Sequence, residues 1–357
     1  TAYKVLKSFT DNSINDKKLK EFIYNSYSKF SNKDVTPLKK ISENQWILEL
    51  FHGPTLAFKD IALQLLGNLF EYYLKVDNKK LIIVGATSGD TGSAAIDAVK
   101  NNTNIKIIIL HPHKRVSEFQ RRQMTTVKSE NVYNIAIKGN FDDCQKLIKE
   151  IFQDSELNKQ TKLGSINSIN WTRIMAQISY YIFAYFKQKK INKNKDIVFS
   201  VPTGNFGDAY AGYLAKSKFN VPIKKIIVAT NKNNILDVFF RTGTYAKTDV
   251  SKTLSPSMDI QVASNFERLL YDLSPINNSG IYDLMTKFNK IGHLRVNKSI
   301  YKKTVEHFCS YTVSEKETLN TIRSIFKKTK IIIDPHTAVG FCATSKYIKN
   351  NNNVDTI

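Results

Sequence analysis

The sequence predicts an α/β protein of two lobes, in which parallel sheets are flanked by helices. Short apolar runs alternate with helical segments from residue 81 onward, and this alternation is typical of parallel βαβ units with right-handed crossovers. A glycine-rich turn follows an apolar run in each half of the chain, at residues 85–92 and 201–208. With 357 residues, 42% of them hydrophobic, the chain can bury a core in each lobe.

We expect residues 1–35 to form an N-terminal helical segment, because residues 11–33 are polar with a weak helical period. The first lobe is expected at residues 36–140 and the second at residues 141–357. In the first lobe, strands are predicted at Leu81–Val84, Ile105–Leu110 and Val132–Ile137, and helices at residues 60–74, 91–100 and 116–126.

In the second lobe, a helix at residues 141–152 and a loop at 164–170 lead into a long apolar helix at 172–186. Strands are predicted at Asp196–Val201 and Ile223–Ala229, with a helix at 208–216 between them. Residues 232–330 are more helical and rich in loops. A last buried strand at Ile331–Ile333 and a helix at 338–347 complete the prediction.

The formal net charge of +22 comes from 53 Lys and Arg against 31 Asp and Glu, spread along the whole length. No zinc-finger, RNA-recognition or basic-zipper pattern accompanies it, so we interpret it as a solvated basic surface that can gather an anionic substrate. No apolar run has the length of a membrane span. The three cysteines are far apart, which indicates a reducing, cytoplasmic compartment and no metal site. We expect neither nucleic acid nor membrane as a partner.

Lys59 is the most informative residue of the chain. It follows a Gly-Pro turn and the apolar run Leu56–Phe58, and it stands where a helix is about to start. Removal from water and the positive end of the helix dipole both lower the pKa of a lysine. A neutral lysine attacks carbonyl groups, as in Schiff-base enzymes. The alternative is a surface lysine at a helix start.

Both glycine-rich turns are candidate anion sites, because each places backbone N–H groups at a helix N-terminus. The first, Gly85–Gly92, lacks the spacing of a dinucleotide motif and the lysine of a P-loop. It is otherwise an ordinary loop capped by Asp90 or Thr91. The second, Val201–Asp208, has two glycines that allow an anion to approach the backbone, or that allow tight strand–helix packing.

Two further segments carry candidate residues. Arg173 stands in the first turn of the long apolar helix, where the helix dipole disfavours a cation. It either faces a bound anion together with Asn167 and Ser168, or forms a salt bridge. In the segment starting at Asp334, His336 is more simply explained as part of a capped helix start than as a site residue.

Five segments together resemble the threonine synthase family, of the bacterial and fungal long-chain kind. They are Glu49–Asp60, Thr87–Gly92, Ser168–Arg173 followed by Met-Ala-Gln at 175–177, Val201–Asp208 and Asp334–Gly340. They occur in the order of the family, and the resemblance runs from about residue 36 to the end. It implies a fold-type II pyridoxal-phosphate enzyme, similar to the tryptophan synthase β-subunit, with its active site in a cleft between the lobes.

The resemblance also implies an activity. Such an enzyme, a carbon–oxygen lyase acting on phosphates, would convert O-phospho-L-homoserine and water to L-threonine and phosphate in amino-acid biosynthesis. It would use pyridoxal 5'-phosphate, with Lys59 as the catalytic residue, as a monomer or homodimer without a metal. The cofactor would be bound by Lys59, Asp90, Gly204, Asn205, Phe206, Gly207 and Asp208. The substrate would be bound by Ser88, Thr91, Asn167, Ser168 and Arg173.

The sequence departs from the family pattern in two ways. The family continues with a Thr-Ala-His-Pro segment whose threonine is thought to meet the pyridine nitrogen, whereas this chain stops at Ile357, and the usual N-terminal start is absent. We therefore expect a chain shortened at both ends. Asp90 stands where many relatives have asparagine. Two alternatives remain open: a phospho-lyase that releases 2-oxobutyrate, and an inactive, cofactor-free relative with a binding role.

Overall fold

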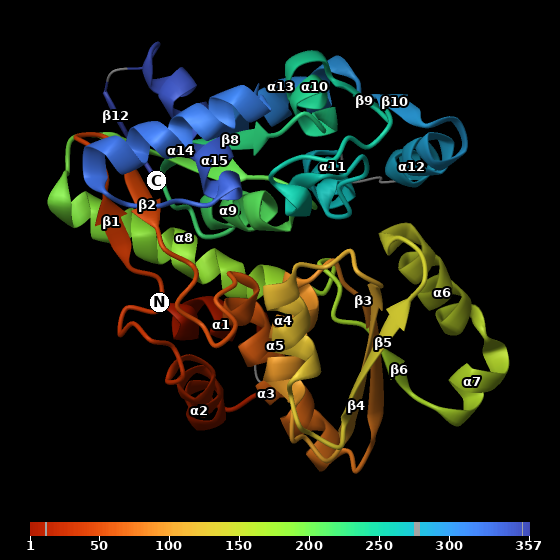
Figure 1. Ribbon diagram of the computed structural model, residues 1–357. Helices are drawn as coiled ribbons and strands as arrows, with labels where there is room; N and C mark the ends of the chain where they lie inside the picture. Colours follow the sequence, from red (N-terminus) through yellow and green to blue (C-terminus); the bar gives the residue numbers. More distant parts are fainter. Residues whose placement is uncertain (11–12, 275–278, 352) are drawn as a thin grey trace. The chain divides into compact units, whose positions relative to one another are not determined.

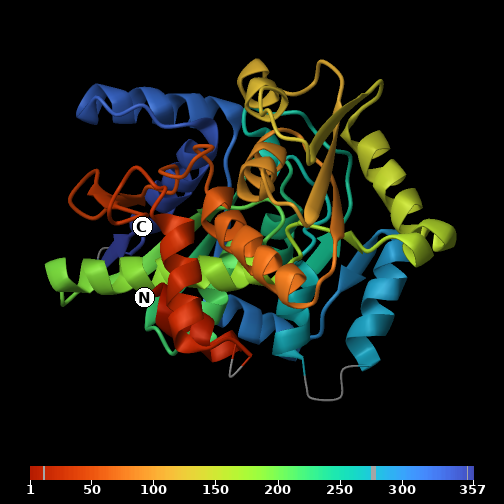
Figure 2. The same ribbon diagram turned by 90° about the horizontal axis from the view of Figure 1, so that it is seen from below.

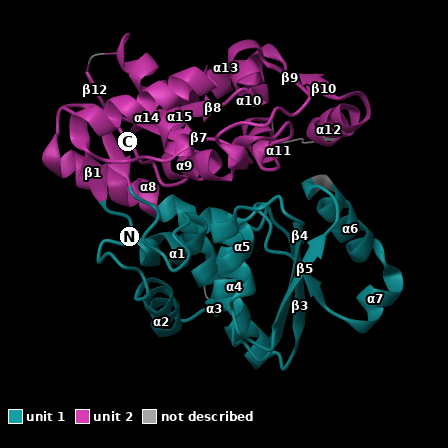
Figure 3. Cartoon of the chain, in the orientation of Figure 1, with its two compact units in different colours: residues 1–37, 49–179 teal, residues 38–48, 180–357 magenta. Residues whose placement is uncertain are grey.

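The computed structural model describes residues 1–10, 13–274, 279–351 and 353–357 (Figure 1). The chain forms two compact units, one of residues 1–37 and 49–179, the other of residues 38–48 and 180–357 (Figure 3). The α/β fold class predicted from the sequence is confirmed, since each unit contains a four-stranded parallel sheet flanked by helices. Among the described residues, a helix with the length and apolarity needed to span a lipid bilayer is absent.

The first unit is built on the strands β3 (Leu81–Ala86), β4 (Ile105–Pro112), β5 (Val132–Ile137) and β6 (Leu163–Gly164), in the order β5-β4-β3-β6. Successive side chains of a strand point to opposite faces of the sheet, and both faces are covered. The isoleucines of β4 at 105, 107 and 109 pack with α3 (Lys59–Val76), α4 (Asp90–Val99) and α5 (Glu118–Thr125). Val84 and Leu110 pack on the other face with α6 (Phe141–Gln153).

The N-terminal helices α1 (Ala2–Thr10) and α2 (Asp16–Tyr27) belong to the same unit. Their apolar residues Leu6, Leu19 and Phe22 form a buried cluster with Ala62 and Leu65 of α3, and Figure 2 shows both helices beside α3. The unit extends to residue 179, beyond the expected boundary at 140, because α6, the short helix α7 (Ser155–Gln160) and β6 complete the first sheet and its cover.

The second unit contains β7 (Asp196–Pro202), β8 (Ile223–Thr230), β11 (Phe308–Thr312) and β12 (Val354–Thr356), in the order β11-β8-β7-β12. Its helices are α9 (Gly207–Ser217), α10 (Ile235–Thr242), α11 (Phe266–Leu273), α12 (Ser279–Ile291), α13 (Lys298–His307), α14 (Glu315–Thr329) and α15 (Pro335–Ile348). Val339 and Ala343 of α15 pack on Val198 and Ile227 of the sheet. The helix α8 (Trp171–Ile191) passes from one unit to the other.

Two small antiparallel pairs complete the second unit. The hairpin β1 (Leu38–Lys40) and β2 (Trp46–Leu48) joins it through a bridge between Gln45 and Thr356, which is why residues 38–48 leave the first unit. The pair β9 (Thr244–Ala246) and β10 (His293–Arg295) lies within the region that the sequence analysis described only as helical and loop-rich.

The predicted strand at Ile331–Ile333 is wrong. These residues connect α14 to α15 without strand structure, after Lys330 in a left-handed conformation with φ of 62°. Ile332 is 79% exposed, so the run is not a buried strand, although its composition suggested one. The sequence analysis also missed three strands of the two sheets, β6, β11 and β12. Of these, β11 pairs in parallel with β8 and forms one edge of its sheet. Its mixed sequence, Phe-Cys-Ser-Tyr-Thr, did not show the apolar run used to find the other strands.

A substitution at the crossing of α3 and α4 tests this packing. A Cβ on Gly67 would collide with the carbonyl oxygen of Ala98, so we expect Gly67→Ala to lower the free energy of unfolding by about 1–3 kcal/mol. Gly280→Ala is the control, because no atom lies within 4 Å of a Cβ there. It should change the free energy of unfolding by less than about 0.5 kcal/mol, because Gly280 is exposed in the first turn of α12. Calorimetric unfolding measures both; equal changes would contradict the crossing.

Candidate active site

Lys59 is the first residue of α3, and its side chain is buried, with the residue only 8% exposed. Its Nζ forms an ion pair and hydrogen bond with Asp90, the first residue of α4. The amine also lies 4.6 Å from the centre of the Phe58 ring. The expected burial of this lysine is confirmed. The ion pair with Asp90 was not expected. Through this pair the first residue of α3 contacts the first residue of α4.

The loop before Lys59 is fixed by Asp60, which is fully buried. Its carboxylate accepts hydrogen bonds from the backbone N–H of Thr55 at 2.8 Å and from the Thr55 hydroxyl at 2.7 Å. Burial raises the pKa of Asp60, while the bonds from Thr55 act in the opposite direction. Gly53 packs so closely on Asp60 that a Cβ would collide with its side chain. The turn is therefore held against the start of α3.

The helix α5 contacts both loops that carry the Lys59–Asp90 pair. Gln123 donates from Nε2 to the carbonyl oxygen of Thr55 at 3.0 Å. Gln120, one turn earlier, lies so close to Gly89 that a Cβ there would meet its amide. Gly89 has φ of 144°, a conformation that favours glycine. The sequence analysis identified the helix but not these two glutamines, whose spacing of three residues puts them on one face.

The turn between β3 and α4 is organised by Thr87 rather than by the residues singled out from the sequence. The Thr87 hydroxyl accepts hydrogen bonds from the N–H groups of Gly89 at 2.9 Å and Gly92 at 2.8 Å. Ser88 is exposed and Thr91 is partly buried. Neither hydroxyl has a hydrogen bond within the described residues, so both are available to a ligand at the start of α4.

Arg173 lies in the first turn of α8, as expected, and is only 3% exposed. Its Nη1 donates to the carbonyl oxygen of Ile166 at 3.0 Å. This bond ties the guanidinium to the loop that contains Asn167, which is exposed, and Ser168, which is partly buried. The three residues therefore belong to one short segment of the first unit, as the sequence order already implied.

In the second unit, the turn after β7 leaves a helix N-terminus open. Phe206, the residue before α9, is left-handed with φ of 64°, and no side chain caps the helix. The first N–H groups of an α-helix have no acceptor within the helix, so an anion can bind there. Gly204 is required by close packing, since a Cβ would lie 2.5 Å from the carbonyl oxygen of Ser257. This arrangement fits a phosphate group.

The carboxylate of Asp208 is occupied by other side chains. One of its oxygens accepts hydrogen bonds from the hydroxyl of Tyr180 and, at 2.9 Å, from that of Tyr181. Burial raises the pKa of Asp208, and the two tyrosines counteract this effect. The negative charge at the start of α9 is thus held by neutral donors. Asp208 can serve an anion site through its backbone N–H, and its carboxylate orients the helix.

His336 has a structural partner in the same region. Its Nε2 accepts a hydrogen bond from the N–H of Ser257 at 3.2 Å, and its Nδ1 lies 3.0 Å from Asp334, the cap of α15. The ring proton is therefore assigned to Nδ1. The interpretation of a capped helix start is correct for Asp334. In addition, His336 holds the segment whose Ser257 carbonyl packs on Gly204.

His111 is a polar residue that the sequence analysis missed. It lies near the carboxyl end of β4, is 5% exposed, and its Nδ1 has no hydrogen-bond partner among the described residues. Burial lowers its pKa, so the neutral ring is favoured. Ligands of parallel sheets bind outside the carboxyl ends of the strands. Only its position at the end of an apolar run could have indicated this histidine.

Comparison with known proteins agrees with these features. Residues 32–284 match the family described as pyridoxal-phosphate dependent enzyme. The threonine synthase of Pseudomonas aeruginosa is 47% identical over 339 residues, covering 95% of this chain and 72% of that protein. The threonine synthase of Saccharomyces cerevisiae is 45% identical over 369 residues, covering 95% and 71%.

A solved structure shows the same likeness. The pyridoxal-phosphate-bound threonine synthase from Brucella melitensis superposes with a TM-score of 0.94 at 40% identity, covering 99% of this chain and 75% of that one. Serine racemase from maize, at 14% identity and a TM-score of 0.60, shares the fold alone. The buried lysine at a helix start, the open N-terminus of α9 and these similarities agree: the chain belongs to the threonine synthase family of pyridoxal-phosphate-dependent enzymes.

Proposed function

We propose that the chain catalyses the conversion of O-phospho-L-homoserine and water to L-threonine and phosphate, with pyridoxal 5'-phosphate as its cofactor. The observation that carries this proposal is the buried Lys59 amine paired with Asp90 at the start of two helices, in a chain 47% identical to a threonine synthase. A surface lysine without a role in the site would be neither buried nor paired with a carboxylate.

The proposed cofactor contacts follow from the local chemistry. Lys59 would bind the aldehyde carbon, and the N–H groups of Asn205, Phe206, Gly207 and Asp208 would bind the phosphate group at the start of α9. Gly204 would hold this turn close to Ser257. The cofactor, when bound, supplies an electron sink for a carbanion on the substrate. Asp90 would lie beside it and offer the Lys59 amine a counter-charge.

The substrate contacts are assigned by charge. The hydroxyls of Ser88 and Thr91 and the N-terminus of α4 are suited to the substrate carboxylate. Arg173, with Asn167 and Ser168, would bind the phosphate that leaves, because a guanidinium is a planar donor that matches phosphate oxygens. The Lys59 amine is suited to remove a proton at Cα and to return one at Cβ.

Two finer expectations remain proposals. The three cysteines form no disulfide in the structure, which supports a reducing, cytoplasmic location. A monomer or homodimer acting on a small substrate, without nucleic acid or membrane, stays a prediction.

Trapping of the lysine tests the proposed cofactor site. Borohydride reduction of the purified protein followed by peptide mass spectrometry should place the pyridoxyl adduct on Lys59, and Lys59→Ala should lose both the adduct and visible absorbance of the cofactor. Lys79, an exposed lysine of the same unit, provides the matched control Lys79→Ala, which should keep both. Product analysis with O-phospho-L-homoserine should find threonine and phosphate in equal amounts. Formation of 2-oxobutyrate without threonine would instead identify a phospho-lyase.

Arg173→Ala tests the assignment of the leaving phosphate. We expect kcat/KM for O-phospho-L-homoserine to fall by about a hundredfold or more, the usual effect of removing one oriented donor for developing charge. The absorbance of bound cofactor should be unchanged, because Arg173 is assigned to the substrate alone. Arg122→Ala, at an exposed arginine of the same unit, should keep full activity. Loss of cofactor from Arg173→Ala would mean that Arg173 belongs to a different pocket.

Gln123→Met tests whether α5 positions Lys59. The variant removes the hydrogen bond to the Thr55 carbonyl while keeping a side chain of similar length, so the loop before Lys59 loses one of its anchors. We expect kcat to fall by between about tenfold and a hundredfold, because small displacements of reacting groups slow catalysis strongly. KM and the melting temperature should change little. Arg122→Met on the same helix is the control; a Gln123→Met enzyme with unchanged kcat would exclude the role.

A further inference from the structure

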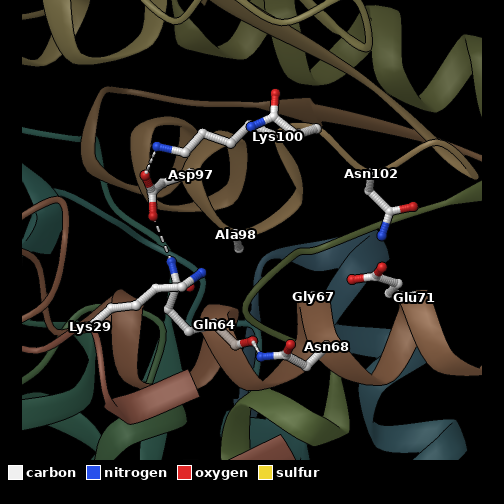
Figure 4. Close-up of a pocket in the computed structure, with 10 residues that line it drawn as sticks. Lys29, Gln64, Gly67, Asn68, Glu71, Asp97, Ala98, Lys100 and Asn102 are labelled. Atoms are coloured by element: carbon white, nitrogen blue, oxygen red, sulfur yellow. Dashed lines mark hydrogen bonds and ion pairs between the residues drawn. The ribbon is translucent and has the colours of Figure 1, made fainter. Parts of the chain in front are cut away.

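The polar hollow between the later turns of α3 and α4 is formed by groups that bind one another. Figure 4 shows Asp97 on one side of it, where its carboxylate accepts a hydrogen bond from Nε2 of Gln64 at 2.7 Å and pairs with Lys100 at 2.5 Å. Because Gln64 belongs to α3 and Asp97 to α4, these groups tie the two helices together. A feature with a clearer chemical role lies in the second unit, at the turn before α9.

Asn265, the residue before α11, is fully buried. Its backbone N–H donates to the carbonyl oxygen of Asn205 at 3.1 Å, and its side-chain Nδ2 donates to the same oxygen at 3.2 Å. Its Oδ1 accepts a hydrogen bond from Nε of Arg268 at 3.2 Å, and this bond orients the side-chain amide so that Nδ2 faces Asn205. One carbonyl group of the turn before α9 is therefore held by two donors of a single buried residue.

The position of Asn265 is fixed by contacts at both ends of α11, which lies beside α9 (Figure 1). At the start of α11, the ring of Phe266 contacts the buried ring of Phe206, with 5.8 Å between the ring centres. Near its end, Asp272 accepts a hydrogen bond from the hydroxyl of Tyr210 in α9 at 2.7 Å. The helix therefore presents Asn265 to the turn in one arrangement.

The hydrogen bonds to the Asn205 carbonyl also set the direction of the next N–H group. The peptide bond between Asn205 and Phe206 is trans, and in a planar trans peptide the carbonyl oxygen and the amide hydrogen point in opposite directions. The Phe206 N–H is therefore directed away from Asn265, and it has no acceptor among the residues that the structure describes. Phe206 is left-handed, with φ of 64°, a conformation that a large side chain adopts only when its surroundings hold it there.

We propose that Asn265 is a positioning residue for the phosphate group of the cofactor. It holds the Asn205 carbonyl on one side of the turn, so that the Phe206 N–H is presented to the phosphate on the other side. This inference rests on the function proposed above and adds to it a residue that acts through the turn rather than by contact with the phosphate. The alternative is a purely structural role at the start of α11, which predicts no selective effect on phosphate binding.

The test compares pyridoxal 5'-phosphate with pyridoxal, which has the same aldehyde and ring but no phosphate group. The full chain is freed of cofactor with hydroxylamine and titrated with each compound, and the absorbance of the bound compound is recorded. Asn265→Ala should bind pyridoxal 5'-phosphate about tenfold more weakly, since one of the two bonds to the Asn205 carbonyl is lost and the backbone bond remains. Its affinity for pyridoxal should be unchanged. Equal weakening of both compounds, or of neither, would overturn the proposal.

Two further variants separate positioning from stability. Asn265→Leu removes the same donor without leaving a cavity, and it should show the same selective loss. Asn297→Ala is the matched control, because Asn297 also precedes a helix of the second unit and caps α13 by accepting from the N–H of Ile300 at 2.9 Å. It should lower the melting temperature and leave the affinity for both compounds unchanged. A selective loss of pyridoxal 5'-phosphate in Asn297→Ala would show that lower stability alone causes it, and would contradict the role of Asn265.

Inorganic phosphate distinguishes failure of this proposal from failure of the proposed function. Titrated into the cofactor-free full chain, phosphate should shift the backbone amide NMR signals of Phe206 and Gly207, and Asn265→Ala should weaken this binding by about tenfold as well. A chain that binds phosphate in this way but not pyridoxal 5'-phosphate would contradict the proposed function and still support the role of Asn265. Signals that do not shift in the unaltered protein, or that shift equally in Asn265→Ala, would overturn that role.

Discussion

The ion pair between Lys59 and Asp90 is the interaction on which the rest of the site depends. A buried amine is costly unless it is paired, and here the partner is the first residue of a different helix. The two helices must therefore start at the same place. The strand β3 leads directly into α4, and Gly67 of α3 packs closely on Ala98 of α4. Both features place the starts of the two helices next to each other. The Lys59–Asp90 pair therefore depends on the packing of α3 against α4 in the first unit.

The loop before Lys59 is held by hydrogen bonds to neutral groups rather than by further ion pairs. The buried carboxylate of Asp60 accepts hydrogen bonds from the N–H and the hydroxyl of Thr55. Gln123 donates a hydrogen bond to the carbonyl oxygen of the same residue. In the second unit, Asp208 is likewise satisfied by two tyrosine hydroxyls. Both carboxylates are therefore satisfied by neutral donors and need no cationic partner.

The sequence was sufficient for the fold class and for the strands β3, β4, β5, β7 and β8 of the two parallel sheets, because strands buried in parallel sheets are continuous apolar runs. The sequence prediction failed where a residue's hydrophobicity did not match its burial. Ile332 is apolar but exposed, and the strand β11 contains polar residues. Lys59 could be found because a lysine after an apolar run is unusual. Asp90 as its partner could not, since the two residues are 31 positions apart and no local pattern links them. The same limit hid Gln123, whose partner Thr55 is 68 positions away.

The candidate site residues lie at helix N-termini in both units, but their side chains are used in different ways. The first residue of α3 is Lys59 and the first residue of α4 is Asp90. Their charged side chains therefore lie at the positive ends of the two helix dipoles. At α9 the start is left without a side-chain cap, and the carboxylate of Asp208 is turned to Tyr180 and Tyr181. None of these three helices has a side-chain cap. The difference between them lies in the side chains at the start, since Lys59 and Asp90 pair with each other whereas Asp208 binds two tyrosines.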